Sequence, residues 1–270
     1  TARQEIWLIL ILLIALNLSV KSFTGTALFH KRHGRYSLDT AAGVSIGLAF
    51  GFHPNGLIIF FPVLGYYIYK LFSQHEFTLK KFLFFIGAFG ITASIFFTLS
   101  FIFNPHFLTD YAAYGETLGV LDSPGSKLSG WIDFYKKIYY QVSGTYYTPN
   151  VRPQFFFFGF TLFVSLLTAV LKPDSRKRLI PLLIGFAGMQ AAFILIGRYG
   201  QPSVVLNLPL LVIISVVTCS ELLSEYRKNW IKYKAISCCL LAFLGSAMLS
   251  EYQISAEISQ NSAYDEYLDQ

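Results

Sequence analysis

Charged residues are scarce in this 270-residue chain. They make up 13% of it, whereas a soluble domain carries about 25%. Hydrophobic residues account for 54% and aromatic residues for 17%, with 27 phenylalanines and 17 tyrosines. A globular fold of this size needs a polar surface, and the chain has too few charged residues to build one. We therefore expect its exterior to face lipid.

Cysteine is also scarce. The three cysteines, Cys219, Cys238 and Cys239, lie within or beside apolar segments, and their spacing fits no metal site. A disulfide between the two adjacent cysteines is disfavoured by geometry. The sequence also lacks a Walker loop, an HExxH pair and a GxSxG elbow. We therefore expect no metal site among the side chains. The sequence identifies no cofactor, and it does not decide whether a divalent cation takes part.

The formal net charge is +6, which by itself is compatible with nucleic-acid binding. The basic residues, however, fall between apolar segments and do not gather along one face. Basic loops between spanning helices are typical of membrane proteins. We therefore expect membrane lipid, and no nucleic acid, as a partner. The oligomeric state is not indicated.

Eight apolar segments divide the chain, and a spanning helix needs about 20 such residues. They cover residues 5–20, 40–52, 56–71, 82–103, 154–171, 179–196, 203–223 and 235–250. The sequence thus predicts an all-α fold, a polytopic transmembrane helical bundle over residues 1–250. A polar tail follows at 251–270, and no internal repeat is apparent.

The basic residues predict the orientation of this bundle. Fifteen of the 21 fall into four groups that alternating segments place on one side of the membrane, and by the positive-inside rule that side is cytoplasmic. The groups are Lys21, Lys31, Arg32 and Arg35; Lys70, Lys80 and Lys81; Lys172, Arg176, Lys177 and Arg178; and Arg227, Lys228, Lys232 and Lys234. Both termini and one long loop, residues 104–153, are then extracytoplasmic.

The sharpest polar feature is the turn His53-Pro54-Asn55-Gly56. One interpretation makes segments 40–52 and 56–71 two half-length helices that meet at this turn inside the membrane, because Pro54 lacks a backbone donor. In the functional interpretation, His53 and Asn55 line an outward-facing cavity and bind an anionic headgroup at a helix start. In the alternative, the turn is a capped kink whose histidine hydrogen-bonds to a neighbouring helix.

Two further pairs are candidates for binding substrate. Arg198 and Tyr199 follow the sixth segment on the predicted outer side, where a guanidinium suits phosphate oxygens. The alternative for Arg198 is snorkelling to lipid headgroups. Arg3 and Glu5 precede the first segment, either as a solvated pair or as partners of a group in the cavity.

The long loop 104–153 opens with Asp110, Tyr111 and Tyr114. A carboxylate there could act as a general base toward a sugar hydroxyl. Ordinary loop polarity explains these residues equally simply and is the interpretation we favour. The many aromatic side chains argue against disorder, and residues 129–142 predict an amphipathic helix lying along the membrane interface. Its lipid-facing residues would be Trp131, Phe134, Tyr135 and Ile138.

Three stretches together resemble the bacterial GT-C glycosyltransferases, polytopic enzymes that take a sugar from a polyprenyl-phosphate donor. They are ARQEIW at 2–7, the helix pair AAGVSIGLAFGFHPNGLIIFFPVLGYYIY at 41–69, and GRYGQPSVVLNLPLLVII at 197–214. The protein O-mannosyltransferases and the aminoarabinose transferase of lipid A belong to this group. The resemblance implies an enzyme of the bacterial inner membrane that glycosylates an extracytoplasmic acceptor.

The resemblance also implies an incomplete enzyme. The catalytic acidic residue of this superfamily lies in the first extracytoplasmic loop, and nothing here matches that motif. We therefore expect a fragment truncated at its N-terminus and assign no catalytic base. A secondary transporter, with broken helices near mid-membrane, and a non-catalytic membrane subunit are the competing predictions.

Overall fold

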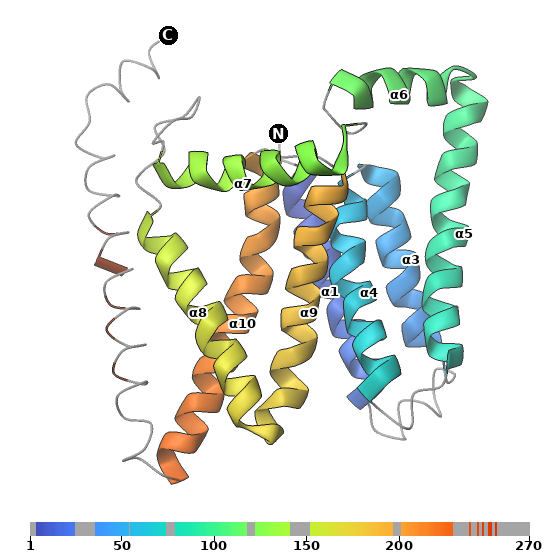
Figure 1. The fold of residues 1–270 in the computed structure, drawn as a ribbon. Coiled ribbons are helices and arrows are strands. Elements are labelled where there is room, and N and C mark those ends of the chain that lie inside the picture. Colours follow the sequence, from blue (N-terminus) through green and yellow to red (C-terminus); the bar gives the residue numbers. More distant parts are fainter. Residues whose placement is uncertain are drawn as a thin grey trace. The chain divides into compact units, whose positions relative to one another are not determined.

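The computed structural model describes residues 4–24, 36–53, 55–73, 79–117, 122–140, 152–196 and 201–228, together with single positions near the C-terminus. Within these ranges every regular element is an α-helix (Figure 1). The helices are α1 (Gln4–Thr24), α3 (Ser37–Phe52), α4 (Gly56–Ser73), α5 (Leu79–Phe103), α6 (Phe107–Thr117), α7 (Pro124–Tyr140), α8 (Arg152–Leu171), α9 (Pro173–Ile196) and α10 (Gln201–Lys228).

Five helices in the described part are long and apolar enough to cross a membrane. These spans are Ile6–Phe23, Gly56–Ser73, Leu79–Phe103, Pro173–Ile196 and Leu206–Ser224, and Ser37–Phe52 and Phe155–Leu171 are shorter apolar helices. Seven of the eight expected segments therefore coincide with helices, and segment 235–250 falls largely outside the described residues. These are the features of a helical membrane protein, as the composition predicted.

Several helices begin earlier than the hydrophobic pattern predicted. Helix α9 begins at Pro173 and not at residue 179, so the charged stretch DSRKR forms its first turns. Proline suits a first helical position, and Asp174 in the first turn complements the positive end of the helix. Helix α5 likewise begins at Leu79 and includes both lysines that follow. A prediction that counts only apolar residues leaves out the charged residues at the ends of a helix.

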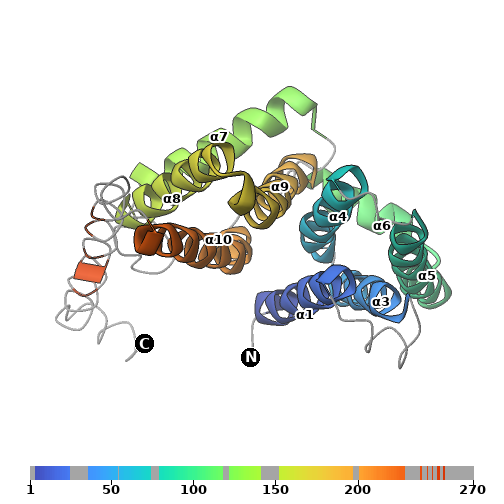
Figure 2. The ribbon, with the colours of Figure 1, turned by 90° about the horizontal axis from the view of Figure 1, so that it is seen from below.

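The chain divides into two compact units, the first formed by residues 1–131 and 180–210 and the second by residues 132–179 and 211–270. In the first unit α3 lies between α1 and α5 (Figure 2). Glycines at every fourth position of α3, Gly43, Gly47 and Gly51, face α5. A Cβ atom on Gly47 would lie only 2.5 Å from Cβ of Thr92, so these helices pack backbone to backbone.

The core of the first unit continues through α1, α4 and α9. Fully buried side chains include Leu12, Ile58 and Tyr67, and the ring of Tyr67 stacks on Phe85 with 4.4 Å between centroids. A Cβ on Gly188 of α9 would lie 3.0 Å from the Phe61 carbonyl oxygen, so α9 also approaches α4 closely.

Helices α3 and α4 form an antiparallel hairpin (Figure 1). The interpretation of these segments as two half-length helices is contradicted for α4. The Gly56–Ser73 helix alone is long enough to cross, with 18 residues, and it returns alongside α3. A Cβ on Gly56 would overlap the Ala49 carbonyl group, so the turn requires glycine at this position. The turn thus joins the ends of two antiparallel helices.

The segment 104–153 contains the helices α6 and α7. Helix α7 covers most of the predicted interfacial helix, but it begins at Pro124 and not at residue 129. Trp131 differs from its predicted lipid-facing role, because it packs against the core of the first unit and hydrogen-bonds to α9. Phe134 and Tyr135 are partly exposed, and the side chain of Ile138 lies outside the described residues.

In the second unit α8 packs on the later part of α10 through small polar side chains. The hydroxyls of Ser165 and Thr218 are 2.6 Å apart, and both are buried. Near the start of α9, Glu221 of α10 accepts hydrogen bonds from Ser175 at 2.6 Å and from Arg178 at 2.9 Å. A charged pair thus joins α9 to α10 in this unit.

Candidate functional site

The turn between α3 and α4 has a defined backbone. His53 ends α3 in an extended conformation, with φ −162° and ψ 142°, and its N–H donates to the Ala49 carbonyl at 3.1 Å. The Gly56 N–H then donates to the His53 carbonyl at 2.7 Å. Helix α4 begins directly after these bonds, and the first N–H groups of a helix form a positive end that favours anions.

The imidazole of His53 is fixed by this turn. Its Nδ1 accepts a hydrogen bond from the Asn55 N–H at 3.0 Å. A neutral ring that accepts at Nδ1 carries its proton on Nε2, so Nε2 is the donor of this side chain. His53 is half-buried and Asn55 is buried, at 6% exposure. The two predicted residues therefore lie together, and both are held at the start of α4.

A polar chain that the sequence analysis missed lies between α7, α9 and α10. The Trp131 indole N–H donates to the side-chain Oε1 of Gln190 at 3.3 Å, and the Gln190 side-chain NH₂ donates to Oδ1 of Asn207 at 2.7 Å. Nearby, Lys127 of α7 donates to the Leu195 carbonyl at 2.7 Å. The sequence did carry a signal for this chain: each of two apolar segments contains one amide side chain. A polar group inside an apolar segment needs a hydrogen-bond partner.

This polar chain and the His53 turn occupy the same end of the first unit (Figure 1). We call it the turn end: it includes His53, Asn55, the end of α5, the end of α9 and the start of α10. Trp131 packs against the core cluster that contains Ile58 of α4 and Phe193 of α9. Helix α7 therefore borders the turn end and is attached there by both an apolar contact and hydrogen bonds.

Asp110 has a local partner. Its carboxylate accepts a hydrogen bond from the Asn104 amide at 2.9 Å, and the Asn104 side-chain oxygen accepts from the His106 N–H at 2.9 Å. Asp110 is exposed and lies in the first turn of α6. This arrangement stabilises a helix start, which agrees with the structural interpretation of Asp110. Tyr111 and Tyr114 lie in α6, and their side chains are outside the described residues.

The remaining predicted site residues are not placed. Arg3, Arg198 and Tyr199 lie outside the described residues. Glu5 belongs to the first turn of α1, and its side chain is likewise not described. Among the residues that the structure describes, no group of three His, Cys, Asp or Glu side chains could hold a metal ion.

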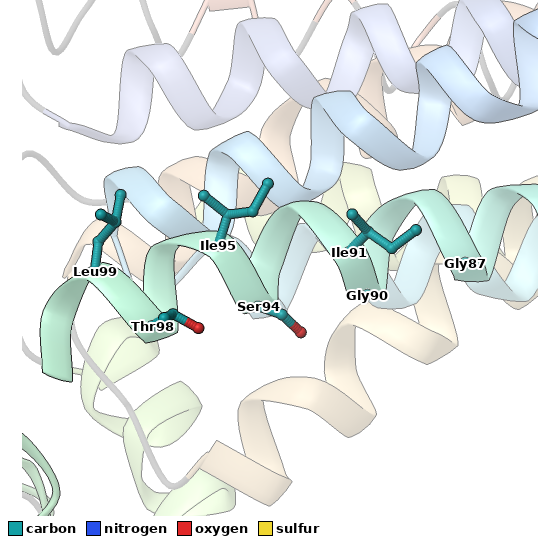
Figure 3. A pocket seen from close by; sticks show the side chains of 7 residues that line it. All are labelled: Gly87, Gly90, Ile91, Ser94, Ile95, Thr98 and Leu99. Atoms are coloured by element: carbon teal, nitrogen blue, oxygen red, sulfur yellow. The ribbon is translucent and has the colours of Figure 1, made fainter. Parts of the chain in front are cut away.

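A groove runs along the outer face of α5 (Figure 3). It is lined by Gly87, Gly90, Ile91, Ser94, Ile95, Thr98 and Leu99, all from this one helix. The glycines have open space where a side chain would stand. No charged group lines the groove, so it lacks the means to perform acid–base chemistry.

The turn end therefore offers neutral donors next to a helix N-terminus. Such groups can hold the oxygens of a phosphate. No protein family matches this chain, and neither a curated protein nor a solved structure matches it.

Proposed function

We propose that this chain is the membrane part of a glycosyltransferase that uses a polyprenyl-phosphate sugar, and that its turn end binds the donor phosphate. The observation that carries the proposal is the His53 imidazole at the N-terminus of α4, where its Nδ1 accepts a hydrogen bond from the Asn55 N–H. The resemblance of residues 41–69 to the GT-C helix pair supports it.

The proposed chemistry follows from charge. When an acceptor hydroxyl attacks the anomeric carbon, the bond to the polyprenyl phosphate breaks and negative charge develops on the leaving phosphate. Donors already in place stabilise that charge without reorganisation. His53 and the start of α4 have this role in our proposal, and Arg198 is a further candidate from the sequence alone. The acceptor is an extracytoplasmic glycan, lipid or protein of a bacterial cell envelope, and the base lies outside the residues described.

The geometry of the α3–α4 hairpin argues against a secondary transporter. That prediction depended on a helix broken near mid-membrane, which is a device of transporters. The hairpin of α3 and α4 places the turn at the helix ends instead (Figure 1). A non-catalytic subunit is the remaining alternative, and it is distinguished by donor binding without sugar transfer.

Replacing His53 with alanine should weaken the binding of polyprenyl phosphate at least about tenfold. A hydrogen bond to a charged group contributes about 1.5–3 kcal/mol, and about 1.4 kcal/mol corresponds to a factor of ten in the dissociation constant. The measurement is the equilibrium binding of radiolabelled polyprenyl phosphate, the part that all such donors share, to the chain in proteoliposomes.

His106→Ala is the matched control. His106 is an exposed histidine that directly precedes α6, and it is not part of the turn between α3 and α4. Its affinity for polyprenyl phosphate should equal that of the unaltered chain. Equal affinities for all three proteins would remove His53 from the donor site, and the absence of saturable binding by the unaltered chain would remove the proposed function.

A further inference from the structure

A second polar cluster lies at the opposite end of the first unit, where α1 and α4 end and α3 and α5 begin (Figure 1). We call it the basic end cluster: Ser22 and Phe23 of α1, Asp39 of α3, Tyr66, Tyr67 and Lys70 of α4, and Lys81 of α5. Polar groups from four helices meet here, although each belongs to a largely apolar segment. Nothing in the proposed donor site uses them.

Asp39 is completely buried, and its partners are hydroxyl groups. Its Oδ1 accepts hydrogen bonds from Ser22 at 2.8 Å and from the Tyr67 hydroxyl at 2.7 Å, while Oδ2 has no hydrogen-bond partner. Within the described ranges no ion pair joins Asp39 to Lys70 or Lys81. The carboxylate is therefore held by neutral donors and sits in the first turn of α3, where a negative charge is favourable.

The two lysines gather around aromatic rings. Lys70 is buried, at 7% exposure, and its ammonium lies 5.5 Å from the ring centroids of both Phe23 and Tyr66. Lys81 lies 4.6 Å from the same Phe23 ring and donates to the Ser22 carbonyl at 2.6 Å. In the described part of the chain, Lys70 has these ring contacts but neither a hydrogen bond nor an ion pair. The Lys70 residue is buried, but its Nζ is not among the fully enclosed side-chain atoms of the described residues, so an anion can reach it.

We infer that Lys70 and Lys81 bind the phosphate of an anionic phospholipid headgroup above the Phe23 ring. The named residues of the cluster include two ammonium groups close to one aromatic ring, an arrangement that attracts an anion such as a phosphodiester. Lysine is a common phosphate ligand, and the start of α5 adds the positive end of a helix.

The position of the cluster favours a lipid as the source of this phosphate. Both lysines lie within about a turn of the end of an apolar helix, which is the depth of the headgroup layer. Basic pockets between spanning helices are known to bind anionic headgroups. This site lies at the other end of the unit from His53, so it stands whether or not the chain transfers sugars.

The test is the binding of a fluorescent phosphatidylglycerol to the full chain, purified in detergent. We expect saturable binding that weakens at least fivefold in Lys70→Met and in Lys81→Met. Lys80→Met is the matched control, because Lys80 is an exposed neighbour on α5 and its loss changes the net charge equally. Phosphatidylcholine with the same acyl chains should bind more weakly, since its headgroup has no net negative charge.

Inorganic phosphate distinguishes the two sources. If millimolar phosphate displaces the lipid from the unaltered chain with the same dependence on both lysines, the site is a phosphate site whose occupant is soluble. If phosphate fails to displace the lipid, the occupant is the phospholipid. The inference is overturned if neither probe binds saturably, or if Lys80→Met weakens binding as much as Lys70→Met and Lys81→Met do.

Discussion

Replacing Gly47 with leucine should lower the free energy of unfolding by about 3 kcal/mol. Even a single Cβ at this position would lie 2.5 Å from Cβ of Thr92 and 3.1 Å from the Phe89 carbonyl oxygen. The second contact is with backbone, so α3 and α5 must move apart to admit a side chain. Overpacking of this kind costs about 1–3 kcal/mol, and leucine demands more room than a methyl group.

Gly90→Leu on α5 is the control for this effect. Gly90 has nothing within 4 Å of its missing Cβ, and leucine is a better helix former than glycine by up to about 1 kcal/mol. Its stability should match or slightly exceed that of the unaltered chain. Both variants are compared by thermal unfolding in the same detergent, and similar losses in the two would show that α3 and α5 do not pack through their glycine face.

The charged pair of the second unit should respond asymmetrically to mutation. The Arg178 side chain is 73% exposed, whereas that of Glu221 is 11% exposed. Arg178→Met removes the counter-charge of a carboxylate that is mostly buried, and we expect a loss of about 3 kcal/mol. Glu221→Gln leaves a guanidinium that is already solvated, and it keeps a side-chain oxygen to accept from Ser175, so the expected loss is about 1 kcal/mol.

The two variants and their combination form a double-mutant cycle, measured by chemical unfolding in detergent. The double variant should lose less than the sum of the single losses, because the uncompensated carboxylate is absent from it. Equal losses in both single variants would contradict the assignment of Glu221 as the buried member of the pair.

The helices could be predicted from the sequence because membrane-spanning segments are recognised by the length of their apolar runs. The relation between α3 and α4 could not. Counted by apolar residues, 40–52 and 56–71 are both short. The structure lengthens α3 with Ser37, Leu38 and Asp39, and Asp39 is tolerated because Tyr67, 28 residues later, donates to it. A partner so distant in sequence leaves no local pattern.

The candidate site was predicted only in part, because only some of its residues are marked by a local sequence pattern. His53 and Asn55 stand out because a histidine and an asparagine flank a proline between apolar runs. Gln190 and Asn207 each look like a single polar residue in an apolar helix, and only the fold brings them to 2.7 Å from each other. Trp131 was expected to face lipid, since an amphipathic pattern does not show which apolar residue finds a neighbouring helix.

The placement of the turn end on the outer side of the membrane is the claim on which the donor site depends, and cysteine labelling tests it directly. Single cysteines at His106 and Lys80, both exposed, report the turn end and the opposite end once the three native cysteines are replaced by alanine. With a membrane-impermeant maleimide on intact cells, the account predicts labelling of His106→Cys, and labelling of Lys80→Cys only after permeabilisation. The reverse pattern would place the turn end in the cytoplasm and contradict the account.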